Sequence, residues 1–76
     1  MEKKILVIDD NESIRMLFEL NLRELGCDVI VARNGEEGIE IIKTKSSEIC
    51  LVITDYEMGQ GMNGVDVVMF IKQHYP

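Results

Sequence analysis

The 76-residue sequence is poor in positive charge and contains no long hydrophobic run. Eight lysines and arginines stand against 14 aspartates and glutamates, which gives a formal net charge of −6. Such a chain repels phosphate backbones and anionic lipids, so we do not expect it to bind nucleic acid or a membrane surface directly. No apolar stretch approaches the ~20 residues of a membrane span. The composition favours a protein or a cation as the partner.

Histidine and cysteine are also scarce. His74 has no second histidine or cysteine near it in the sequence, so a zinc site is unsupported. Cys27 and Cys50 should lie on or beside different strands, and an intervening strand would hold them beyond the ~7 Å that a disulfide can bridge. We expect both to be reduced, as in the cytosol. The first strand begins too near the N-terminus for a signal peptide, so a cytoplasmic location is expected.

Two apolar runs that end on aspartate are the most informative pattern present. They are residues 4–10 (KILVIDD) and residues 49–55 (ICLVITD). Both are too short for a helix and rich in Val and Ile, which is typical of strands buried on both faces of a parallel sheet. Ligands of parallel sheets bind beyond the carboxyl ends of such strands. If the strands are neighbours, Asp9, Asp10 and Asp55 converge and repel one another by roughly 1 to 4 kcal/mol per pair, which predicts a cation site.

An amphipathic helix is predicted after the first strand. Residues 11–13 (NES) offer helix-starting side chains, and Gly26 should end the helix as a left-handed cap. The residues at helical spacing that should form its buried face are Ile14, Leu17, Phe18, Leu22 and Leu25. Residues 28–32 are short and β-branched, so they are predicted to form the second strand.

Two further helices follow. Asn34 and Glu37 resemble a capping box that opens a helix running to about Lys45, with Ile39 and Ile42 directed inward. Residues 46–48 are predicted to be a turn before the third strand. After a glycine-rich loop, the buried stripe of a third helix is predicted to comprise Gly64, Val67, Val68 and Ile71. The alternation of strand and helix predicts an α/β fold with a parallel sheet and right-handed crossovers.

The aspartates suggest a specific chemistry. Mg²⁺ prefers oxygen ligands and is commonly held by one or two carboxylates plus a substrate phosphate, which Asp10 and Asp55 could provide. A carboxylate beside bound Mg²⁺ can also attack phosphorus as a nucleophile. The alternative is that acidic residues at strand ends merely begin solvated loops. Two such ends, one with a double aspartate, favour the metal site.

Four segments together resemble the receiver domain of bacterial response regulators, over essentially the whole chain. They are residues 5–12 (ILVIDDNE), 32–38 (ARNGEEG), 51–58 (LVITDYEM) and 62–64 (MNG). The resemblance implies a flavodoxin-like (CheY-like) sheet, truncated to three βα units with strand order 2-1-3 over residues 1–76. It implies that Asp55 is the phosphoacceptor, that Asp10 ligates Mg²⁺ directly and Asp9 largely through water, and that the backbone carbonyl of Glu57 is a further ligand. The implied partner is a sensor histidine kinase or phosphotransfer protein, or a small phosphodonor.

The sequence departs from the receiver pattern in two ways. The segment 59–61 (GQG) replaces the usual proline after the acceptor and adds one residue, which should loosen that loop. A receiver has five strands and five helices, whereas this chain stops where the fourth strand should begin. The phosphate-binding Ser or Thr, the Lys and the aromatic switch residue of the later strands are therefore missing. We expect that metal binding can persist while signal output is lost.

Three functions stay open on the sequence alone. The first is a phosphoacceptor module, which is not a turnover enzyme. The second is a structural half-receiver that forms a homodimer, because strand three would present an unpaired apolar edge able to pair antiparallel with its mate around a twofold axis. The third, a Mg²⁺-dependent phosphohydrolase with an aspartyl nucleophile, is disfavoured because the residues after Asp9 lack the second aspartate two positions on.

Overall fold

The computed structural model describes residues 3–55 and 64–74 of the chain. Strands and helices alternate along it, as the sequence predicts. The elements are β1 (Lys4–Ile8), α1 (Glu12–Glu24), β2 (Asp28–Ala32), α2 (Gly35–Lys45), a 3₁₀ turn (Ser46–Glu48), β3 (Ile49–Thr54) and α3 (Gly64–His74). None of the helices in the described part of the chain is long and apolar enough to cross a membrane.

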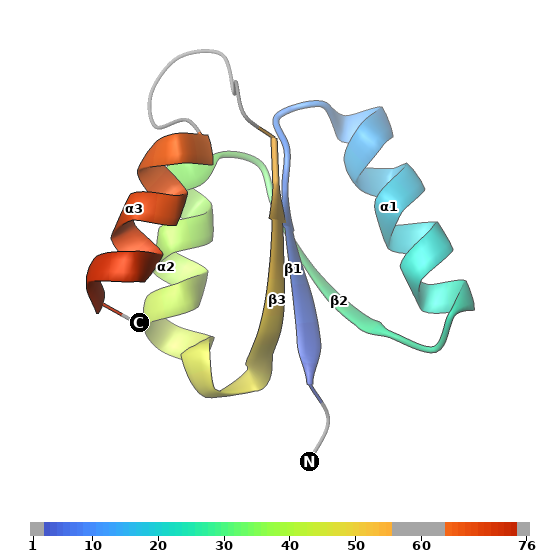
Figure 1. The fold of residues 1–76 in the computed structure, drawn as a ribbon. Coiled ribbons are helices and arrows are strands. Elements are labelled where there is room, and N and C mark those ends of the chain that lie inside the picture. Colours follow the sequence, from blue (N-terminus) through green and yellow to red (C-terminus); the bar gives the residue numbers. More distant parts are fainter. Residues whose placement is uncertain (1–2, 56–63, 75–76) are drawn as a thin grey trace.

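The three strands form one parallel sheet with the order β2-β1-β3, which confirms the predicted topology. α1 covers one face of the sheet, and α2 and α3 cover the other (Figure 1). Lys4 lies opposite Ile49 while Ile5 lies opposite Leu51, so Cys50 is an extra residue in β3. Both Cys27 and Cys50 are free thiols, and β1 lies between the strands they adjoin, as predicted.

The ends of α1 are set by local hydrogen bonds. The Asn11 side chain accepts a hydrogen bond from the backbone N–H of Ile14 at 3.1 Å and so caps the N-terminus. At the other end, Gly26 has φ 86°, the N–H of Cys27 donates to the carbonyl of Leu22, and the N–H of Gly26 donates to that of Arg23. This pair of bonds is a Schellman motif, which confirms the predicted left-handed glycine cap.

The cap of α2 differs slightly from a capping box. The Asn34 side chain accepts from the backbone N–H of Glu37 at 2.8 Å, as predicted. The Glu37 carboxylate, however, accepts from the backbone N–H of Arg33 at 3.0 Å, one residue before the cap. The same carboxylate also accepts hydrogen bonds from the Arg33 guanidinium at 3.2 Å. The Glu37 side chain therefore bonds to the backbone of Arg33, whose positive charge it also contacts, and not to the backbone of the cap residue.

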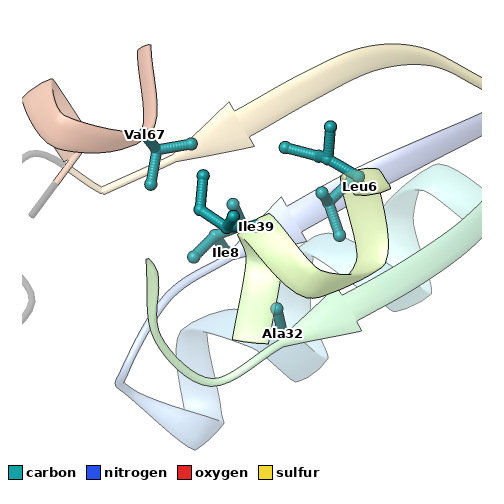
Figure 2. Packing of buried hydrophobic residues seen from close by; sticks show 6 residues of the cluster. Leu6, Ile8, Ala32, Ile39 and Val67 are labelled. Atoms are coloured by element: carbon teal, nitrogen blue, oxygen red, sulfur yellow. The ribbon is translucent and has the colours of Figure 1, made fainter. Parts of the chain in front are cut away.

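The larger core lies between the sheet and the helices α2 and α3. Its buried members are Leu6, Ile8, Ala32, Ile39, Ile42 and Val67. Figure 2 shows that β1, β2, α2 and α3 all contribute to it. A Cβ at Gly38 would collide with the Ile8 side chain, so this glycine lets α2 approach β1 closely. The predicted inward positions of Ile39, Ile42 and Val67 are confirmed.

One predicted member of the α3 stripe is exposed. Val68 keeps 44% of its surface accessible, whereas Val67 is fully buried and Ile71 is half-buried. The prediction for Val68 is therefore wrong. α3 contacts α2, and the apolar residues Val65, Val68 and Met69 of α3 are exposed.

The apolar face of α1 is present but largely uncovered. None of the 13 residues of α1 is buried, and only Leu22 of the predicted face packs against a core cluster. Leu17 is 55% exposed and Leu25 is 78% exposed. The predicted burial of this face is wrong because α1 lies alone on its side of the described sheet (Figure 1).

Candidate metal centre

Three aspartates meet at the carboxyl ends of two neighbouring strands. Asp9 and Asp10 follow β1, and Asp55 follows β3. The backbone N–H of Asp55 donates to the carbonyl of Ile8, and that of Asp9 donates to the carbonyl of Ala32, each at 3.1 Å. The sheet therefore continues one residue beyond the strands and holds Asp9 and Asp55 side by side.

Their carboxylates lie close enough to share a ligand. One oxygen from each of Asp9, Asp10 and Asp55 lies within 4.8 Å of the others. Asp9 is buried, with 8% of its surface accessible, while Asp10 and Asp55 are exposed. The structure thus brings together the three aspartates that the sequence singles out. Glu57, the fourth predicted ligand, lies outside the described residues.

The turn from β1 to α1 is built by its own polar groups. The Asp9 carboxylate accepts the backbone N–H of Asn11 at 2.9 Å, and Asn11 in turn caps α1. This is a local turn in which an aspartate side chain accepts a hydrogen bond from the backbone two residues further on. It holds the buried carboxylate in one orientation while Asp10 faces solvent.

Arg15 is part of the site's framework, and the sequence analysis missed it. Its Nη1 donates to the backbone carbonyl of Asp9 at 2.8 Å, and its side chain is half-buried. The guanidinium thereby ties the first turn of α1 to the end of β1. The sequence did contain a signal that could have identified Arg15, because it is a single cation in the helix turn that follows Asp9 and Asp10.

The donor set fits a hard divalent cation. Mg²⁺ takes oxygen ligands at about 2.0 to 2.1 Å in octahedral geometry, which places neighbouring ligand oxygens roughly 3 Å apart and opposite ones roughly 4 Å apart. Three carboxylate oxygens within 4.8 Å need only small rotations to reach that geometry. Two of the three side chains are exposed and free to make them. A bound cation would also relieve the mutual repulsion of the three charges.

Comparisons with known proteins agree with one another. The family model described as the response regulator receiver domain matches residues 5–76. The chain is 38% identical over 73 residues to the alkaline phosphatase synthesis transcriptional regulatory protein PhoP of Bacillus subtilis, covering 96% of this chain and 29% of that protein. It is 35% identical over 72 residues to the autoinducer 1 sensor kinase/phosphatase LuxN of Vibrio campbellii, covering 95% of this chain and 8% of that protein.

Solved structures share the fold. The chain superposes on the crystal structure of a response regulator receiver domain protein from Clostridium thermocellum with a TM-score of 0.91 and 35% identity. The superposition covers 97% of this chain and 58% of that one. A response regulator receiver protein from Pseudomonas putida gives a TM-score of 0.86 at 31% identity, over 99% of this chain and 60% of that one. The chain therefore spans little more than half of a solved receiver domain.

Proposed function

The chain belongs to the response regulator receiver family of two-component signalling, and from this membership we propose that it is a phosphoacceptor module whose acceptor is Asp55. The observation that carries the proposal is the convergence of Asp9, Asp10 and Asp55 at one edge of the sheet. Asp55 is exposed and directly follows β3, so an incoming phosphoryl group can reach it from solvent. In this proposal residues 1–76 act as one unit.

In this proposal Asp9 and Asp10 hold the metal together with Asp55. Asp10 and Asp55 bind Mg²⁺ directly with the backbone carbonyl of Glu57, and Asp9 orients the ion largely through water. Asp9 suits the indirect role, because one of its oxygens already accepts the N–H of Asn11. When bound, Mg²⁺ supplies the positive charge that offsets the negative charge on the phosphoryl oxygens.

The transfer is a substitution at phosphorus. A carboxylate oxygen of Asp55 attacks the phosphorus of a phosphohistidine in line with the leaving nitrogen. The new O–P bond forms as the N–P bond breaks, and the electron pair stays on the imidazole, which takes up a proton from solvent. The donor is a sensor histidine kinase or a phosphotransfer protein, and a small acyl phosphate can replace it. The likeness to a segment of the sensor kinase/phosphatase LuxN supports a kinase partner. The free cysteines suit a cytoplasmic location, which belongs to the same proposal.

A second candidate function is favoured by a separate observation. β3 is the last strand of the described sheet and has no strand on its outer side. A chain of this kind could serve as a structural module that associates with itself and takes no phosphate. The two candidates differ in whether Asp55 carries a phosphoryl group.

Intact-mass spectrometry separates the two candidates. The chain is incubated with Mg²⁺ and acetyl phosphate beside the variants Asp55→Asn and Asp28→Asn, the latter a control at the opposite end of the sheet. We expect one phosphoryl adduct on the wild type and on Asp28→Asn, none on Asp55→Asn, and none on any of them with a chelator. Unmodified wild type under these conditions would contradict the phosphoacceptor proposal and leave the structural module.

A further inference from the structure

The turn between β1 and α1 contains a closed ring of hydrogen bonds. The Asp9 carboxylate accepts the backbone N–H of Asn11 at 2.9 Å, and the Asn11 carbonyl accepts the backbone N–H of Arg15 at 3.0 Å. The Arg15 guanidinium then donates from Nη1 to the Asp9 carbonyl at 2.8 Å, which closes the ring. All of its groups belong to residues 9–15.

Asp10 is the residue that this ring encloses. A peptide unit is planar, so a hydrogen bond to its C=O or N–H orients the whole unit. The peptide before Asp10 is held by Arg15 through the Asp9 carbonyl, and the peptide after it is held by the Asp9 carboxylate through the Asn11 N–H. These two hydrogen bonds together fix the backbone from which the Asp10 carboxylate projects.

The Asp10 side chain has no anchor of its own in the described ranges 3–55 and 64–74. Asp10 is exposed, and none of the hydrogen bonds and ion pairs found among the described residues involves its carboxylate. Asp9 differs, because its carboxylate is buried and bound to Asn11. An Asp10 oxygen nevertheless lies within 4.8 Å of oxygens of Asp9 and Asp55. That placement therefore depends on how the backbone of Asp10 is held.

We propose that Arg15 is a positioning residue of the metal centre. It acts through the Asp9 carbonyl and holds the peptide between Asp9 and Asp10 so that the Asp10 carboxylate meets Asp55 at the cation. The inference rests on the proposed function, since it takes the three aspartates as the Mg²⁺ site. Arg15 is assigned no contact with the ion or with the phosphoryl group. It gives the ligand Asp10 the kind of outer support that fixes ligand orientation in metal sites.

The charge of Arg15 acts on the metal in the opposite direction. The guanidinium is bonded to the backbone of Asp9, so it brings a positive charge beside the acidic cluster. That charge repels Mg²⁺, and on this ground alone its removal should tighten metal binding about two- to fivefold at moderate salt. Outer residues that orient metal ligands typically contribute about 10- to 100-fold in affinity. If Arg15 positions Asp10, its removal should therefore weaken Mg²⁺ binding despite the loss of a repelling charge.

A simpler role for Arg15 would be to dock α1 on the sheet, and the same helix supplies a matched control for it. Arg23 Nη2 donates to the Val29 carbonyl at 3.4 Å, so it also joins α1 to a strand through an arginine–carbonyl hydrogen bond. At 1.5 Å per residue the two arginines lie about 12 Å apart along the helix axis. Arg23 is in the last turn of α1, at the end away from the three aspartates.

Calorimetric titration with Mg²⁺ measures the contribution of Arg15. Arg15→Met removes the charge and the donor but keeps an unbranched apolar stem, and Arg23→Met makes the same change at the control position. We expect Arg15→Met to bind Mg²⁺ about tenfold more weakly than the wild type, and Arg23→Met to bind it within about twofold. Unchanged or tighter binding by Arg15→Met, or equal weakening by both variants, would overturn the proposal. Circular dichroism checks folding, and Arg15→Gln replaces Arg15→Met if the latter does not fold.

Backbone relaxation in the metal-free chain tests the positioning itself. The ¹⁵N order parameter of the Asp10 N–H reports the rigidity of the peptide whose carbonyl Arg15 holds. We expect about 0.85 in the wild type and in Arg23→Met, and a value near or below about 0.6 in Arg15→Met. An equally rigid Asp10 N–H in all three proteins would overturn the role of Arg15, whatever their Mg²⁺ affinities.

The outcomes separate this inference from the proposed function. A wild type that bound no Mg²⁺ would overturn the metal site and, with it, the role of Arg15. A wild type that bound Mg²⁺ and accepted a phosphoryl group, beside an Arg15→Met variant of the same Mg²⁺ affinity, would overturn the role of Arg15 alone.

Discussion

β1 and β3 have nearly the same composition and opposite surroundings. β1 reads KILVI, and four of its five residues are buried. β3 reads ICLVIT, and none of its six residues is buried. The difference follows the positions of the strands, because β1 lies between two strands and β3 lies at the edge of the described sheet. An apolar run therefore marks a strand without saying how much of it the fold covers.

Replacing one leucine in each strand by alanine should show the largest contrast in unfolding free energy. Leu6→Ala in β1 removes a fully buried side chain and should cost about 2 to 5 kcal/mol. Leu51→Ala in β3 removes a half-exposed one and should cost under about 1 kcal/mol at low protein concentration. Urea unfolding measures both. A cost for Leu51→Ala that grows with protein concentration would show that the β3 edge becomes buried by self-association.

At the acidic carboxyl ends of the same strands, substitutions should change stability through charge more than through packing. Asp10→Asn removes one of three converging carboxylates, so the metal-free chain should become more stable by about 1 kcal/mol. Mg²⁺ should stabilise the wild type and have little effect on this variant. Thermal unfolding with and without Mg²⁺ gives both numbers. If Asp10→Asn left the Mg²⁺ effect intact, the three aspartates would not act as one metal site.

The smallest expected effect on stability comes from the ion pair between Lys4 and Glu48, which lies at the amino ends of the two strands. The pKa of Glu48 is lowered mainly by its hydrogen bond and charge interaction with Lys4. A carboxyl group with a lowered pKa stabilises the folded state above its ordinary value of 4.5, and this contribution is lost as the pH falls through the folded pKa. Glu48→Gln should therefore be slightly less stable than the wild type at pH 7. Denaturant unfolding should show the gap closing below pH 4.5, and a gap independent of pH would rule out this origin.

Much of the fold could be predicted from local sequence signals. The strand ends, the caps at Asn11 and Asn34 and the left-handed Gly26 all depend on groups a few residues apart, and each is present. The convergence of Asp9 and Asp55 was predictable for a related reason, because neighbouring parallel strands end at the same edge. Their roles as metal ligand and acceptor stay predictions.

The failures share a different cause. Val68 and Leu17 stand at the spacing of a buried stripe, and both are exposed. Periodicity tells which residues share a helix face, but it does not tell how much surface lies opposite that face. Arg15 was missed because its hydrogen bond to the Asp9 carbonyl joins a helix side chain to a turn, and no residue pattern predicts that contact.

The sequence by itself determined the strand and helix order, the helix caps and the presence of aspartates at two strand ends, because each rests on hydrogen bonds or periodicity within a short segment. The tertiary structure alone decided the extra residue in β3, the hydrogen bond from Arg15 to the Asp9 carbonyl, and the exposure of α1 and β3. These features depend on which segments, distant in sequence, come to lie side by side. Burial is a property of that arrangement, so two strands of like composition can end up as the centre and the edge of one sheet.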